Sequence, residues 1–196
     1  MRKTILPLFL TLFLLFSFST VATASELQVN PNPTIKYSID FEDDLLVGAT
    51  LLSETQEIIN GRIITTSIYE LSDGTIMTDI FERAFINARS KNGSDTATRT
   101  RKLDEWGSIT LTASFKWRTE GMFSYVKCTS ASASRDLDSN AVVSKWLLTR
   151  TEDEVSMGKA NATLSYNMYN RQAPFQYRDG SVRITCSDSG TISDNA

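Results

Sequence analysis

Apolar and polar residues alternate along much of the second half of the chain. In residues 108–118, every second side chain is apolar and shares one face of the segment; these are Ile109, Leu111, Ala113, Phe115 and Trp117. Residues 159–169 repeat the pattern with Ala160, Ala162, Leu164, Tyr166 and Met168. A period of two over this length is typical of a half-buried strand in an antiparallel sheet. Shorter runs of the same kind predict further strands at 123–128, 142–149 and 181–186.

Two turn signals divide the first half of the chain. Asn60-Gly61 separates two runs rich in β-branched residues, and Asp73-Gly74 separates the second run from a third. Such pairs favour two-residue type I′ loops, in which both central residues need positive φ. We therefore predict a meander of three strands joined by two-residue loops, at 51–59, 62–71 and 75–85. Part of the segment 42–57 also fits a short helix that begins at its acidic residues.

These strands predict an all-β fold. The expected architecture is an antiparallel β-sandwich or a partly open barrel of about eight strands, in which two apolar sheet faces close on each other. An extended leader at 25–36 contains Asn-Pro twice and precedes a single β-rich domain at 37–190, and a polar tail follows at 191–196.

A polar stretch at 87–103 interrupts the strand pattern. Residues 87–100 show no apolar face, so we expect either a long surface loop or a connection between two lobes, 37–86 and 104–190. Within this stretch, a basic cluster indicates a solvated loop or a protease-sensitive linker; its members are Arg99, Arg101 and Lys102.

The first 24 residues have the parts of a secretory signal peptide. Arg2 and Lys3 form a positive region, residues 5–18 an apolar region, and small residues up to Ala24 a cleavage site. The apolar run is shorter than the roughly 20 residues of a membrane-spanning helix, and an uncleaved anchor is the alternative. We expect cleavage after Ala24, secretion to the extracellular space and no membrane association afterwards.

Two cysteines, Cys128 and Cys186, stand in this exported chain. In an oxidising compartment we expect them to form a disulfide. In the chain-entropy model, a bridge that closes a loop of this length stabilises the fold by about 4 kcal/mol. The alternative is that both are buried free thiols, which act as small apolar side chains.

Charge and composition exclude several classes of function. The net charge is −3 for the full chain, and loss of Arg2 and Lys3 makes it more negative, which argues against a nucleic-acid partner. Histidine is absent, so Ser-His-Asp and Cys-His catalysis are excluded. No phosphate-binding or dinucleotide-binding motif is present, and we expect no cofactor. The acidic clusters at 42–44 and 152–154 leave a carboxylate-dependent glycosidase as the catalytic alternative.

One segment resembles the first half of an EF-hand calcium loop. Asp136, Asp138 and Asn140 occupy alternate positions that would supply oxygen ligands 1, 3 and 5. The sixth position is Ala141 in place of glycine and the twelfth is Leu147 in place of glutamate, so the EF-hand assignment fails. A looser calcium site or a plain turn rich in Asp and Asn remains.

The aromatic residues Tyr169, Phe175 and Tyr177 surround a predicted loop that contains Pro174. Aromatic rings exposed near a loop supply a stacking platform for a sugar or an apolar partner. We select these three as candidate binding residues, with burial in the core as the alternative.

The export signal and the C-terminal strand pair at 158–169 and 180–190 resemble those of small secreted β-rich proteins of Gram-positive bacteria. This resemblance implies secretion and carries no active site with it. We expect a non-catalytic binding or interaction module whose partner is an extracellular polysaccharide or a surface protein. The alternatives are a toxin or immunity-type structural protein and, less favoured, the glycosidase.

Overall fold

A computed structural model describes residues 44–85, 91–173 and 175–194. All the described residues belong to one compact unit. The predicted signal peptide at 1–24 and leader at 25–36 lie outside the described residues. The described part is all-β, as the alternation predicted, apart from the 3-10 turn η1 (Asp44–Leu46).

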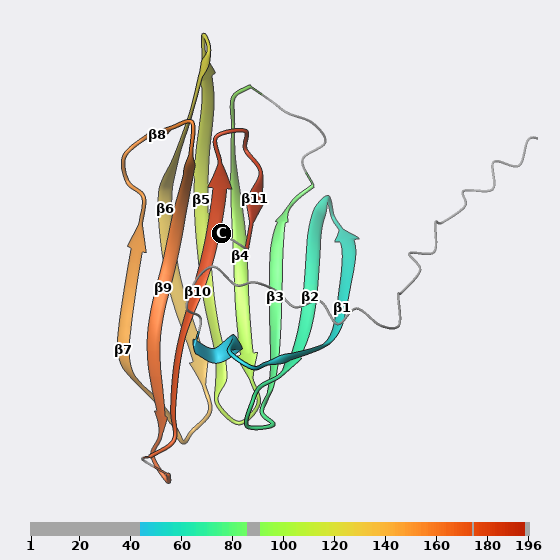
Figure 1. The fold of residues 1–196 in the computed structure, drawn as a ribbon, viewed down its shortest axis with the longest axis vertical. Helices are drawn as coiled ribbons and strands as arrows, with labels where there is room; N and C mark the ends of the chain where they lie inside the picture. The colour runs from blue at the N-terminus through green and yellow to red at the C-terminus, as the bar shows by residue number, and fades with distance from the viewer. Residues whose placement is uncertain (1–43, 86–90, 174, 195–196) are drawn as a thin grey trace, which may run out of the picture. The chain divides into compact units, whose positions relative to one another are not determined.

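The described strands form two antiparallel sheets (Figure 1). The larger sheet has the order β1-β2-β3-β4-β5-β6-β8, with the bounds Thr50–Ile59, Arg62–Glu70, Ile76–Ala84, Gly93–Leu103, Gly107–Glu120, Phe123–Leu137 and Val155–Ser156. The smaller sheet has the order β11-β10-β9-β7, with the bounds Ile192–Ser193, Tyr177–Ser187, Lys159–Asn170 and Ala141–Arg150. The eight predicted strands are present, and β4, β8 and β11 are additional.

The first predicted hairpin loop is confirmed. Ile59 of β1 pairs with Arg62 of β2, which leaves a loop of two residues between them. Asn60 has a φ of 52° and Gly61 a φ of 74°, so both central residues lie in the region that a type I′ turn requires.

The prediction of a two-residue loop at Asp73-Gly74 is wrong. The N–H of Gly74 donates to the carbonyl of Leu71 (2.9 Å), and the N–H of Leu71 donates to the carbonyl of Thr75 (2.9 Å). The loop therefore has three residues, of which only Gly74 has positive φ, at 83°. Three-residue hairpin loops combine a type I turn with one left-handed residue, and glycine suits that position.

Strand β4 overturns the prediction that residues 87–100 have no core face. It pairs with β3 on one side and with β5 on the other. On its inner face the side chains of Ala97, Arg99, Arg101 and Leu103 are all buried. The basic cluster is thus part of a central strand rather than a solvated loop or linker. Residues 87–90 of the expected loop lie outside the described residues.

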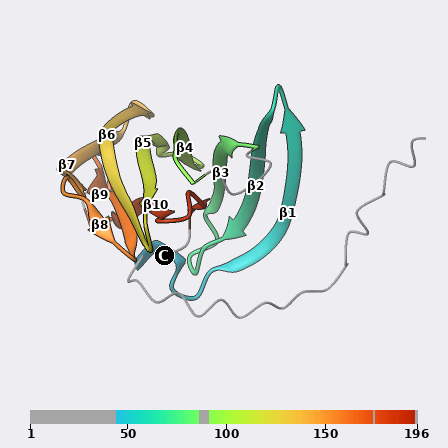
Figure 2. The same ribbon diagram turned by 90° about the horizontal axis from the view of Figure 1, so that it is seen from above.

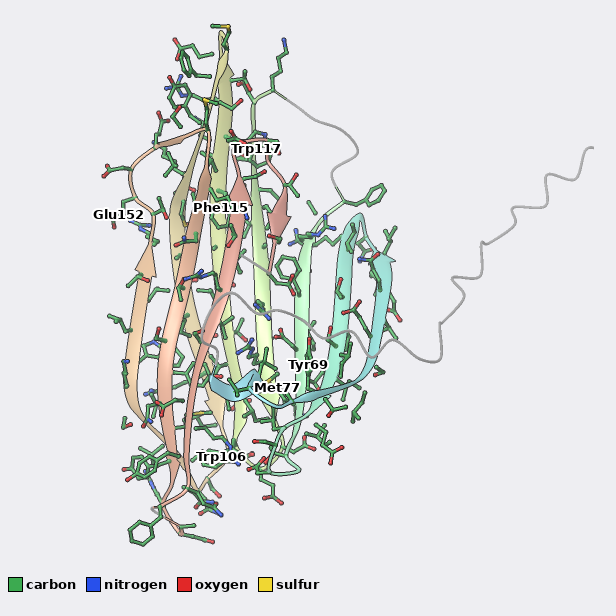
Figure 3. The ribbon with its side chains drawn as sticks, viewed as in Figure 1. Tyr69, Met77, Trp106, Phe115, Trp117 and Glu152 are labelled. Carbon is green, nitrogen blue, oxygen red and sulfur yellow. The ribbon has the colours of Figure 1, made fainter. Side chains whose placement is uncertain are left out.

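The two sheets pack face to face as a sandwich and do not close into a barrel. Strands β9 and β10 of the smaller sheet contact β4, β5 and β6, whereas β1 and β2 extend beyond it (Figure 2). All the apolar positions predicted on 109–117 and 160–168 are buried. Phe115 and Trp117 from β5 lie in this layer between the sheets (Figure 3).

The predicted polar tail at 191–196 contributes to the sheet. Ile192 of β11 pairs with Cys186 of β10, and its side chain is buried. A single apolar residue among polar ones gives no periodic signal, so the alternation could not predict this strand.

Candidate functional site

Strands β9 and β10 bring two of the three predicted aromatic residues together. Tyr169 and Tyr177 are directly opposite each other in the antiparallel register. Their ring centroids lie 6.3 Å apart and the ring planes are tilted by 49°. Both belong to the outer face of the smaller sheet, because the alternate residues of β9 and β10, Met168 among them, face the core. Tyr177 is 55% exposed.

Phe175 lies in the loop between these strands. Its side chain is 93% exposed, so the ring has almost no packing within the domain. Phe175 in the loop and Tyr177 at the start of β10 are thus exposed, while Tyr169 is half-buried.

A row of polar side chains crosses the sheet next to the tyrosines. The amide Nδ2 of Asn167 in β9 donates to Oδ1 of Asp179 in β10 (2.7 Å). The hydroxyl of Ser144 in β7 donates to the amide oxygen of Asn167. Ser144 occupies a register shift between Val143 and Lys145, which adds an extra residue to β7 at this row. Three strands thus contribute amide, carboxylate and hydroxyl groups beside the aromatic pair.

This arrangement has the chemistry of a surface that binds sugars. Aromatic rings offer an apolar face for stacking and a polar tip at each tyrosine hydroxyl. The neighbouring Asn167–Asp179 pair supplies donors and acceptors that an alcohol group can use. We refer to Tyr169, Phe175, Tyr177, Asn167 and Asp179 as the aromatic patch.

The calcium candidates lie at the C-terminal end of β6, where the N–H of Arg171, in the loop after β9, donates to the carbonyl of Asn140 (2.8 Å). Asp136 is on β6 and pairs with Ser108, while Asp138 and Asn140 belong to the connection to β7. The N–H of Asp138 donates to the carbonyl of Trp106 (3.2 Å), and its own carbonyl accepts from Ala141 (2.9 Å). Among the described residues, no three Asp, Glu or Cys side chains gather in a way that could hold a metal ion.

Two of the carboxylates considered for a glycosidase, Glu152 and Glu154, are engaged in exposed ion pairs. Glu152 pairs with Arg150 (3.2 Å) and lies on the connection after β7 (Figure 3). Glu154 pairs with Arg118 (3.0 Å), and hydrogen bonds from that guanidinium lower the pKa of Glu154. A general acid needs the opposite shift. Residues 42 and 43 of the other acidic cluster lie outside the described residues.

Both cysteines are buried and free in this structure, so the predicted disulfide is not formed. Cys128 belongs to β6 and Cys186 to β10, on opposite sides of the core. The thiol of Cys128 donates to the carbonyl of Ser130 (3.3 Å). Burial raises the pKa of Cys186 to about 12, and the charge of Asp95 and the Cys128 thiolate act in the same direction.

A buried ion cluster on β3 and β4 escaped the sequence analysis. Asp79 accepts from Nε of Arg99 (2.9 Å) and from Nε of Arg101 (3.0 Å), and all three side chains are buried. Burial opposes ionisation of Asp79, but the two guanidinium charges hold its pKa below the ordinary value. The arginines also donate to backbone carbonyls, those of Arg183 (3.2 Å), Asp194 (2.8 Å) and Ser181 (2.6 Å).

An open cavity of about 590 Å³ lies beside the start of β4 and the end of β5, lined in part by Asn92, Lys116, Trp117 and Glu120. The indole of Trp117 is not presented to it as a platform, because the ring is buried between two glycines. A Cβ at Gly93 or Gly190 would lie 2.5 Å or 2.3 Å from that ring. Both glycines therefore serve the packing of Trp117.

Within the described residues, none of the helical structure is long and apolar enough to span a membrane. No protein-family model, curated protein or solved structure matches the chain.

Proposed function

We propose that this chain is a secreted, non-catalytic binding module that recognises an extracellular polysaccharide through the aromatic patch. The supporting observation is the cross-strand pair Tyr169–Tyr177, with ring centroids 6.3 Å apart on an outer sheet face. Exposed aromatic rings are costly to leave in water without a partner, and here they lie beside hydrogen-bonding groups. A surface protein is the alternative partner.

A polysaccharide fits the mixed character of the patch. Sugar rings have apolar C–H faces that stack on tyrosine and hydroxyl groups that hydrogen-bond to amides and carboxylates. The patch combines the exposed rings of Phe175 and Tyr177 with the Asn167–Asp179 pair. A purely apolar protein interface would not need that polar row.

Affinity electrophoresis in gels that contain soluble cell-wall polysaccharides tests this proposal. The wild-type protein should be retarded, and Tyr177→Ala should remove at least about 90% of the retardation, since stacking area is lost. Phe123→Ala is the matched control, because Phe123 is a comparably exposed aromatic residue outside the patch, 48% exposed against 55% for Tyr177. Equal loss in both variants, or no retardation of the wild type by any polysaccharide, would reject the patch as the site.

Secretion is part of the same proposal. The positive, apolar and small-residue regions at 1–24 support cleavage after Ala24. Mass spectrometry of the protein from culture medium should find Ser25 as the first residue. Recovery of the chain only from the membrane fraction, with Arg2 and Lys3 retained, would contradict it.

We also propose that Cys128 and Cys186 become a disulfide in the secreted protein, by loss of two protons and two electrons to an extracellular thiol oxidant. The two free thiols stand in the same core, on β6 and β10. Because the two thiols are not at bonding distance in this structure, closure needs a shift of the backbone. Labelling of denatured, unreduced protein should find no free thiol, and complete labelling of both residues would exclude the bridge.

A further inference from the structure

The hairpin of β5 and β6 carries large apolar side chains at its very end. These are the longest strands of the sheet, 14 and 15 residues, and their tip projects beyond the other strand ends at that side (Figure 1). Glu120 pairs with Phe123, which leaves Gly121 and Met122 as a two-residue loop. Gly121 has a φ of 63°, as the first central position of a type II′ turn requires. Met122 at the second position is 91% exposed.

A neighbouring turn adds a third apolar side chain. Met157 follows the short strand β8, and its N–H donates to the carbonyl of Ser124 (2.9 Å), next to Phe123. Met157 is 70% exposed. We call Met122, Phe123 and Met157 the apolar tip. Tight turns usually carry glycine, asparagine, aspartate or serine. The exposed apolar side chains of the tip add little to the core.

A charged belt lies below the apolar tip: Arg118 and Tyr125 stand two residue pairs from the Glu120–Phe123 pair, and Lys116 and Lys127 stand four. Arg118 forms ion pairs with Glu120 and with Glu154 (3.0 Å), and its guanidinium lies 4.5 Å from the ring centroid of Tyr125. Lys127 approaches Glu154 at 3.9 Å. Lys116 pairs with Lys127 in the strand register, so the belt holds three cations against two carboxylates.

We propose that the apolar tip docks into the interfacial layer of a lipid bilayer. A fluid bilayer surface can deform around three separate projecting side chains, whereas a protein partner needs a broad complementary area. The arginine, tyrosine and lysine side chains of the belt, two to four residue pairs below the tip, belong at the depth of lipid headgroups, where their charged or polar ends stay hydrated. The slight excess of cations favours anionic headgroups.

The backbone of the hairpin limits the depth of insertion. The polar groups of the Gly121-Met122 loop need water or headgroup partners, because an open loop cannot satisfy them in the hydrocarbon region. The contact is therefore shallow and reversible. The expectation of no membrane association after cleavage applies to spanning segments, and a shallow contact of a hairpin tip needs none.

The test is co-sedimentation of the purified protein with vesicles of phosphatidylcholine and of phosphatidylcholine with phosphatidylglycerol. Mass spectrometry first establishes the N-terminus, so that all variants share it. The wild type should sediment with both vesicles, two- to threefold more strongly with the anionic ones at low salt. Met122→Ser combined with Phe123→Ser should lower the partition coefficient at least about tenfold, because most of the inserted apolar area is lost.

Phe175→Ser is the matched control, since this side chain is even more exposed but belongs to the aromatic patch. It should leave vesicle binding unchanged, while the double variant keeps polysaccharide retardation. If the double variant unfolds, Met157→Ser on the other turn replaces it, with an expected loss of about threefold or more. A wild type that does not sediment, or equal losses in tip and control variants, overturns the proposal. Capture of an envelope protein that depends on the tip, without sedimentation, reassigns it to a protein partner.

Discussion

Strands β4 and β5 are neighbours in one sheet, yet they fill the same core with opposite chemistry. Arg99 of β4 lies directly opposite Leu111 of β5, and Arg101 lies opposite Ile109. All four side chains are buried on the same face. The leucine and isoleucine stabilise the core by removing apolar area from water, whereas the arginines depend on Asp79 of β3 to neutralise part of their charge.

Alternation of apolar and polar residues detects some strands of this sheet and misses others. The pattern identifies a strand when its buried face is apolar, as in β5 and β9. The buried face of β4 consists of Ala97, Arg99, Arg101 and Leu103. The two charged residues in the middle give its sequence the pattern of a solvated loop. Their partner Asp79 is 20 and 22 residues away in the chain. The pairing follows from the three-dimensional register and from no local signal.

The largest loss of unfolding free energy is expected from replacing Asp79, the partner of both arginines. Asp79→Asn keeps the side-chain volume but leaves two buried guanidinium groups without a counter-charge, which should cost about 3–5 kcal/mol of unfolding free energy. Urea denaturation at pH 7 measures it. A loss below 1 kcal/mol would mean that water or another group neutralises the arginines.

The same cluster predicts a dependence on pH. The pKa of Asp79 is lowered in the folded state by Arg99 and Arg101, against the opposing effect of burial. Its stabilising effect is therefore complete above the unfolded pKa of about 4 and is lost as the pH falls through the lower folded value. The difference in stability between wild type and Asp79→Asn should stay constant from pH 7 to about 5 and shrink only in strong acid. A difference that already closes at pH 6 would contradict this assignment.

Replacing all three charged residues of the cluster by apolar ones gives the buried face of β4 the same apolar chemistry as that of β5. The triple variant Asp79→Leu, Arg99→Met and Arg101→Met removes all the buried charges together, so it should recover most of the stability that Asp79→Asn loses. Some loss should remain, because three backbone carbonyls lose their arginine donors. Urea denaturation of both variants in parallel gives the comparison, and a triple variant less stable than Asp79→Asn would show that the arginines hold the two sheets in register.

Leu111→Ala tests how much the apolar side chains on the buried face of β5 stabilise the fold. Leu111 is fully buried opposite Arg99, and its truncation leaves a cavity that should cost about 2–5 kcal/mol. No titratable group is removed, so this loss should be independent of pH between 3 and 7. A pH-dependent loss would indicate that Leu111 acts by shielding the ion cluster from water.

Of the two proposed binding surfaces, the aromatic patch could be predicted from the sequence and the apolar tip could not. Tyr169 and Tyr177 could be selected from the sequence because they flank one hairpin loop, so their proximity is local. The tip could not, since Met157 reaches Phe123 only through the pairing of β8 with β6. Exposure of an apolar residue is likewise set by the fold, because the same residue type fills the core elsewhere in the chain, as Met77 and Met168 do.

The outer faces of β4 and β5 predict the smallest effect, because there the two strands carry the same chemistry. Thr98 and Thr112 are cross-strand partners whose hydroxyls lie 3.2 Å apart, and Thr100 and Thr110 repeat the pair at 3.0 Å. The double variant Thr98→Val and Thr112→Val removes one half-exposed hydrogen bond but keeps two β-branched side chains in a sheet that favours them. Its unfolding free energy should stay within about 0.5 kcal/mol of wild type. Thermal denaturation at pH 7 measures it, with Leu111→Ala as the reference for a buried position. A loss as large as that reference would mean that the hydroxyl-bearing face is covered in the folded protein.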